Sequence, residues 1–133
     1  MMNFTSEWTS IPAPAEKVFA KATNLEQLGE AMPEQIVNWK ADSDRCSFTI
    51  KGMTSLNLRV DEKKPLSFMR LVPEGKSPVE FELLLHIKET NDASSSIMVE
   101  ISADLNPMLA MMAKRPLQNL VDSIAARLGS WSY

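Results

Sequence analysis

Histidine and cysteine are almost missing from this chain of 133 residues, which contains one of each, His86 and Cys46. Transition-metal sites usually draw several of their ligands from these two residue types, so we expect no such site. A single cysteine also excludes an internal disulfide and favours a reducing compartment. The sequence therefore predicts a protein that works without a metal, and we expect no cofactor.

The features of nucleic-acid-binding, membrane-spanning and secreted proteins are missing as well. The 14 basic and 17 acidic residues leave a net charge of −3, and no basic block supplies the electrostatic footprint of a nucleic-acid-binding protein. No uninterrupted apolar run reaches the roughly 18 residues that a membrane span needs. Residues 1–8 have neither the positive charge nor the apolar stretch of a secretory signal. We therefore expect a cytoplasmic protein with no nucleic-acid partner and no membrane span.

The composition that remains is that of an ordinary globular protein, with 44% hydrophobic and 23% charged residues. A chain of this length can bury roughly two thirds of the surface that it exposes when unfolded, which is enough for a stable core without disulfides or a structural metal. No internal repeat and no linker-like tract interrupts the sequence. We expect one domain over residues 1–133, with a core over about 3–128 and a tail at 129–133.

The first third of the chain predicts one strand and two short helices. Residues 3–10 alternate as a strand, which the prolines of Ile11-Pro-Ala-Pro bring to an end. Residues 15–22 place Val18, Phe19 and Ala22 on one helical face. Asn24 can cap a second helix over residues 25–32, which Pro33 terminates.

The middle of the chain predicts a series of antiparallel strands. In the clearest of them, apolar residues alternate with polar ones, which is typical of a sheet that is covered on one face. The segment after residue 52 and the polar segment after residue 89 have the composition of turns. The predicted strands cover residues 35–42, 45–52, 54–62, 67–73, 79–88 and 97–105.

The last third predicts one long helix with an apolar stripe. Asn106 can cap it, Pro107 suits its first position, and the stripe continues to about Leu128. Pro116 removes one backbone hydrogen bond in the middle of the helix and should bend it there. We expect the residues after Leu128 to fray, with Trp131 exposed or docked on a neighbouring molecule.

The segment Ile11-Pro-Ala-Pro-Ala-Glu-Lys-Val-Phe, together with this order of elements, resembles the START-like superfamily. This helix-grip group includes polyketide cyclase-like proteins and the birch-pollen allergen family. Over residues 3–128 the chain looks like a small bacterial polyketide cyclase/dehydratase-like (SRPBCC) protein. The resemblance implies an α+β fold. A curved antiparallel sheet of about seven strands would carry the long C-terminal helix across its concave face, with an apolar cavity between them.

The resemblance also implies a small hydrophobic ligand, because family members bind or transport lipids, sterols, polyketides and similar molecules, and some are cyclases or hydrolases. The cyclase-type members place acid, base or hydroxyl groups inside the cavity. The inward faces of this chain are almost wholly aliphatic and aromatic. We therefore expect a ligand-binding or transport protein, assign no catalytic residue, and lean against an enzyme.

The inward-facing apolar positions supply the candidate cavity lining. Ser6 falls between Phe4 and Trp8 and is a candidate polar contact to a ligand, although a buried serine usually bonds to the main chain instead. Arg70 is ambiguous, because an inward arginine would need a carboxylate on the protein or on a ligand. The predicted lining residues are Trp8, Phe48, Leu58, Phe81, Leu83, Leu85, Met112, Pro116 and Leu120.

Two other functions stay open at this point. One is a polyketide cyclase/dehydratase-like enzyme, for which Ser6, Arg70 and Asn38 are the polar groups that the sequence places near the cavity. The other is a protein-interaction module with a solid core. In this module the polar face of the sheet, or an apolar helix edge with Met108 and Met111, binds another protein or a second copy of the chain. The sequence leaves a homodimer open.

Overall fold

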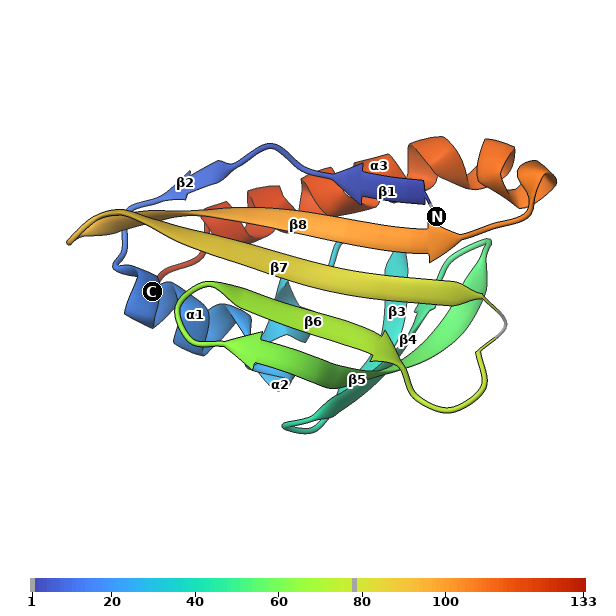
Figure 1. The fold of residues 1–133 in the computed structure, drawn as a ribbon, viewed down its shortest axis with the longest axis horizontal. Coiled ribbons are helices and arrows are strands. Elements are labelled where there is room, and N and C mark those ends of the chain that lie inside the picture. Colours follow the sequence, from blue (N-terminus) through green and yellow to red (C-terminus); the bar gives the residue numbers. More distant parts are fainter. Residues whose placement is uncertain (1, 78) are drawn as a thin grey trace.

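An antiparallel sheet of eight strands forms the body of the computed structural model, which describes residues 2–77 and 79–133 (Figure 1). The strands are β1 (Met2–Thr5), β2 (Thr9–Ile11), β3 (Ile36–Ala41), β4 (Arg45–Ile50), β5 (Thr54–Lys64), β6 (Phe68–Pro73), β7 (Glu80–Asn91) and β8 (Ser94–Asp104). The helices are α1 (Ala15–Ala22), α2 (Leu25–Leu28), the 3-10 helix η1 (Gly29–Ala31) and α3 (Pro107–Gly129).

The strands are ordered β1-β8-β7-β6-β5-β4-β3, and β2 also pairs with β8. From β3 to β8 each strand therefore pairs with the next one along the chain, and the two N-terminal strands return to the edge of β8 (Figure 1). The helix α3 packs against β8, β1, β2 and η1. The α+β helix-grip arrangement predicted from the sequence is confirmed.

The predicted first strand is divided in two by an extra residue. Thr5 pairs with Glu100 and Thr9 with Ile97, so three residues of the N-terminal segment face two residues of β8. Such a bulge shifts the inward face from even-numbered to odd-numbered positions. Phe4 and Ile11 are therefore both buried, although strict alternation would place them on opposite faces.

The predicted helix starts are confirmed. The Asn24 side chain accepts a hydrogen bond from the backbone N–H of Gln27, and Asn106 accepts one from Leu109 in the same way, at 3.2 and 2.9 Å. The α1 bounds are as predicted, whereas the second helix tightens into η1 after Leu28 and ends at Ala31.

Inward-facing side chains of the sheet and one side of α3 form the core. In the sheet these include Leu58, Leu71, Val99 and Ile101, all fully buried. The buried positions of α3 begin at Ala113, and most of them follow Pro116; they are Ala113, Leu117, Leu120, Val121, Ile124, Ala125 and Leu128. The second half of α3 thus packs closely on the sheet, while its first turns do not.

The chain end is docked, which corrects the expectation of a frayed tail. The Tyr133 hydroxyl donates a hydrogen bond to the carbonyl of Leu128 at 2.7 Å. The Lys21 ammonium group donates to the carbonyl of Ser132 at 2.7 Å and lies 4.9 Å from the centre of the Trp131 ring. These contacts hold the last residues against α1. None of the helices in the described parts of the chain is long and apolar enough to cross a membrane.

Candidate functional site

A pocket of about 310 Å³ opens beneath the first half of α3. Its walls come from the turn between β4 and β5, the start of β7, the end of β8 and the helix itself. It is more enclosed than the other surface depressions and most of its surface is apolar. The lining residues are Lys51, Gly52, Met53, Thr54, Val79, Phe81, Ala103, Leu105, Leu109, Met112, Ala113, Pro116 and Leu117.

The pocket exists because α3 closes on the sheet only after Pro116. Before that residue, Leu109 and Met112 face the pocket but stay largely exposed, and Ala113 is the buried position. Proline has no N–H to donate to the carbonyl four residues earlier, so the helix has one bond fewer at this point. The pocket lies under the first half of α3, before the helix closes on the sheet.

Small side chains at two inward positions leave this volume unfilled. Along β8 the inward series runs Ile97, Val99, Ile101 and then Ala103, whose side chain is too small to fill the space near the strand end. Ala113 is its counterpart on α3. Both alanines are almost fully buried, so a larger side chain at either place would extend into the pocket.

Polar groups occur at one border of the pocket. Lys51 and Thr54, in and after the β4–β5 turn, are the polar side chains among the described lining residues, and Lys51 is exposed. Lys51 is also the one titratable residue among the described lining residues. A positive charge next to an apolar pocket can meet an acidic or polar end of a ligand while the walls contact its apolar part. The described lining offers no pair of groups for acid–base catalysis.

Three of the predicted lining residues, Phe81, Met112 and Pro116, line the pocket. Five others are buried in the core away from it: Phe48, Leu58, Leu83, Leu85 and Leu120. Their inward orientation was predicted correctly. They belong to the buried hydrophobic core and do not line the pocket.

Trp8 lies outside the core, with 42% of its surface exposed. The bulge before β2 turns its side chain away from the face that carries Phe4, and the Lys88 ammonium group lies 4.3 Å from the centre of its ring. The assignment of Trp8 to the cavity lining is therefore corrected. The prediction assumed strict alternation through residues 5–9, where the pairing register with β8 in fact changes.

Ser6 is buried, but main-chain groups satisfy its hydroxyl. This oxygen accepts a hydrogen bond from the N–H of Val99 at 3.0 Å and donates one to the carbonyl of Glu7 at 3.0 Å. Ser6 lies beside an open groove between the β1–β2 segment and the second half of α3, not in the pocket. Its bonds hold the strand break in place, which matches the alternative of a serine bonded to the main chain.

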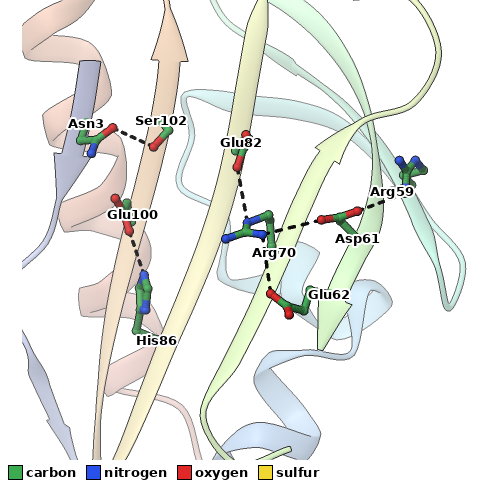
Figure 2. A network of polar contacts seen from close by, with 9 residues as sticks. All are labelled: Asn3, Arg59, Asp61, Glu62, Arg70, Glu82, His86, Glu100 and Ser102. Carbon is green, nitrogen blue, oxygen red and sulfur yellow. Dashed lines mark hydrogen bonds and ion pairs between the residues drawn. The ribbon is translucent and has the colours of Figure 1, made fainter. Parts of the chain in front are cut away.

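Arg70 lies on the outer face of the sheet. Its guanidinium group approaches the carboxylates of Glu82, Glu62 and Asp61 at 3.5, 3.6 and 3.8 Å (Figure 2). In Figure 2 these side chains project from the same face of neighbouring strands. The inward orientation considered for Arg70 is wrong, because protein carboxylates of the outer face are its partners.

The same outer face carries the chain's one histidine. The His86 Nε2 atom lies 2.8 Å from a carboxylate oxygen of Glu100 on the neighbouring strand (Figure 2). Its ring also packs against that of Phe68, with 5.2 Å between the ring centres. This pair is separated from the pocket by the sheet, so it contributes to the surface and not to the candidate site.

Several lining residues were not predicted from the sequence: Val79, Ala103, Leu105, Leu109, Ala113 and Leu117. Two signals could have indicated them. Alanines interrupt otherwise bulky inward series at Ala103 and Ala113. Both positions also lie near the β8–α3 connection, where the helix is only beginning to close on the sheet.

No protein-family model and no curated protein matches the sequence of this chain. Solved structures do match its fold. The protein XoxI from Bacillus cereus superposes with a TM-score of 0.76 at 13% identity, over 97% of this chain and 94% of that chain. A START superfamily protein from Mycobacterium smegmatis gives a TM-score of 0.65 at 13% identity, over 95% of this chain and 96% of that chain.

A third similar structure is the di-domain ARO/CYC protein BexL from the BE-7585A biosynthetic pathway. It gives a TM-score of 0.73 at 15% identity, over 97% of this chain and 45% of that chain. Identities this low establish an architecture and leave the chemistry of the site open. The eight-stranded sheet, the two short helices and the long closing helix give this chain the START-like helix-grip fold.

Proposed function

We propose that the protein binds or transports a small hydrophobic molecule in the pocket under the first half of α3. The observation that carries this proposal is a partly enclosed, mainly apolar space of about 310 Å³. This volume lies at the lower end of the range for small-molecule sites, about 300–1,000 Å³. The START superfamily and ARO/CYC neighbours are consistent with such a role.

The lining favours a ligand that is apolar over most of its length. Phe81, Leu105 and Leu117 supply flat and branched apolar surface, while Met53 and Met112 supply flexible thioethers. Methionine adapts to irregular shapes, which suits a site that accepts related molecules. Binding would be driven mainly by removal of apolar surface from water. The ligand class we propose is a lipid-like or polyketide-like molecule.

The first experiment is native mass spectrometry of freshly purified protein, followed by organic extraction of any bound molecule. A released hydrophobic compound of defined mass would identify the ligand class. Titration with the apolar fluorophore N-phenylnaphthylamine gives an independent measurement, because this probe becomes bright in apolar surroundings. We expect saturable binding, with one probe per chain.

A substitution that fills the pocket tests its location. Ala113→Leu should weaken probe binding about tenfold or more, because the added carbons occupy the space between α3 and the sheet. The matched control is Ala126→Leu, which adds the same atoms to an exposed position of the same helix and should leave the affinity unchanged. Leu109→Asn, at an exposed position of the lining, should also weaken binding without affecting folding. Unchanged affinity in both lining variants would refute the assignment of the site.

A further inference from the structure

The first turns of α3 expose an unusual concentration of apolar side chains. Met108, Met111 and Met112 are 73%, 84% and 70% exposed, and Leu109 is exposed as well. The large exposed hydrophobic residues elsewhere in the described chain are Trp8 and Leu66. Contiguous exposed apolar surface on a monomer usually marks an interaction site. We call residues 107–115 the helix tip.

The helix tip is basic as well as apolar. It carries Lys114 and Arg115 and no acidic residue, whereas the whole chain has a net charge of −3. Neither cation takes part in the ion pairs of the described residues. At the end of β8, just before α3, Asp104 lies opposite Glu80 of β7 in the strand ladder. Alternation with the inward Phe81 and Ala103 places them on the outer face of the sheet, away from α3.

A groove on the outer side of the helix tip is also lined by apolar and basic side chains. It lies between β1 and α3, has a volume of about 780 Å³ and is lined by Met2, Asn3, Phe4, Met111, Lys114, Arg115, Gln118 and Asn119. Its described lining contains two cations and no carboxylate. An anionic group could therefore approach Lys114 and Arg115 while apolar atoms contact Met2 and Met111.

We propose that the helix tip docks on an anionic lipid surface, with its methionines inserted at the level of the headgroups. Exposed apolar residues with adjacent cations are the combination by which interfacial helices bind anionic bilayers. Leu109 and Met112 of the same tip line the ligand pocket, so docking would bring the pocket entrance against the lipid. The surface goes beyond the proposed function and does not require that the pocket hold a ligand.

The test is co-sedimentation of the full chain with vesicles of phosphatidylcholine alone or with added phosphatidylglycerol. We expect sedimentation with the anionic vesicles, weak sedimentation with the neutral ones, and release as salt is raised. Met108→Ser combined with Met111→Ser should lower the partition coefficient roughly tenfold or more. Lys114→Gln combined with Arg115→Gln should lower it by a similar factor and remove most of the salt dependence.

Matched controls lie at the β5–β6 turn, at the opposite end of the sheet from the start of α3 (Figure 1). Leu66→Asn removes an exposed apolar side chain at a positive φ of 67°, which asparagine tolerates. Lys63→Gln combined with Lys64→Gln removes two adjacent exposed cations, as in the tip variant. These controls should bind vesicles like the original protein. The proposal is overturned if the original protein stays in the supernatant, or if these controls lose as much binding as the tip variants.

Two further outcomes separate this proposal from others. The vesicles could bind no protein while the mass of the protein in solution rises with its concentration. If Met108→Ser combined with Met111→Ser abolishes that rise, the tip binds a second copy of the chain and the lipid proposal is refuted.

The fluorophore titration is repeated on the tip variants, whose substituted methionines do not line the pocket. Vesicle binding without probe binding would refute the ligand proposal alone, and probe binding without vesicle binding would refute the docking proposal alone.

Discussion

The hydroxyl of Ser6 accepts a hydrogen bond from the N–H of Val99 at the point where β1 and β2 separate, two residues before Trp8. With the N–H of Val99 bonded to this hydroxyl, the chain accommodates one extra residue between β1 and β2. The pairing register then changes, and Trp8 turns outward under Lys88. The Ser6–Val99 bond, between residues far apart in the sequence, thus lies where the face on which later residues point changes.

Cys46 is a residue for which the structure makes a chemical prediction. It is buried on the inward side of β4, and burial, with a smaller effect of the Asp42 charge, raises the pKa of its thiol to about 12. We expect it to react with a thiol reagent at pH 8 far more slowly in the folded protein than in denaturant, because the thiolate is the reactive form. Equal rates in the two states would contradict the burial of Cys46.

The same pKa shift has a consequence for stability. Because folding raises the pKa of Cys46 above its ordinary value of 9.0, the contribution of this thiol is complete below about pH 9. This contribution is lost as the pH rises towards 12, where Cys46 ionises in the folded protein as well. Cys46→Ala should therefore lose less stability than the original protein over this alkaline range.

At the scale of the elements, β3 is tied to the second helix by Trp39. A register shift between Val37 and Lys40, with Asn38 at a φ of 59°, carries Trp39 over the helix. Its indole N–H donates to the carbonyl of Leu25 at 3.1 Å, and its ring stacks on Phe48 with 5.3 Å between ring centres. An edge strand is thereby covered, which protects it from pairing with other chains.

Gly29 is required by this contact, because a side chain there would overlap the Trp39 ring. We predict that Gly29→Ala lowers the free energy of unfolding by about 1–3 kcal/mol, the usual cost of overpacking. Urea denaturation followed by tryptophan fluorescence measures it. Glu30→Ala, at an exposed position of the same turn, is the control and should change stability by less than about 0.5 kcal/mol. If both variants lose equally little stability, Gly29 and the Trp39 ring are not in close contact.

At the scale of the whole molecule, the two halves of α3 have different roles. The half after Pro116 closes the core, and its end is joined to α1 through Lys21 and the docked tail. The half before Pro116 leaves a pocket open and exposes the helix tip. The fold is thus closed at one end of the helix and open at the other, and both proposals concern the open end.

Tyr133 reports whether the tail closes the molecule in solution. It is the single tyrosine of the chain, so the near-ultraviolet absorbance of the phenolate measures this residue alone. Burial raises its pKa well above the ordinary value of 10.0, and we expect ionisation in the folded protein at a correspondingly higher pH than in denaturant. Lys21→Ala removes the bond to Ser132 and should shift the titration back towards 10.0. If Tyr133 of the folded original protein instead ionised with its ordinary pKa of 10.0, the tail would be free in solution.

The sequence by itself determined the features that depend on neighbouring residues. Capping by Asn24 and Asn106, interruption by the prolines and alternation along β7 and β8 are local, and they predicted the order of elements. The helix-grip fold was implied by the resemblance of that order to the START-like superfamily. Inward orientation was predicted correctly wherever a strand keeps one register, as at Phe48, Leu58 and Phe81.

Only the tertiary structure decided the features that depend on contacts between distant segments. The bulge opposite Val99, the outer-face carboxylates around Arg70 and the docking of the tail on Lys21 each join residues far apart in the chain. The pocket is of the same kind, because its position follows from where α3 stops closing on the sheet and not from how apolar each face is. Alternation gives the direction in which a side chain points, whereas packing between elements decides whether the space in front of it is filled.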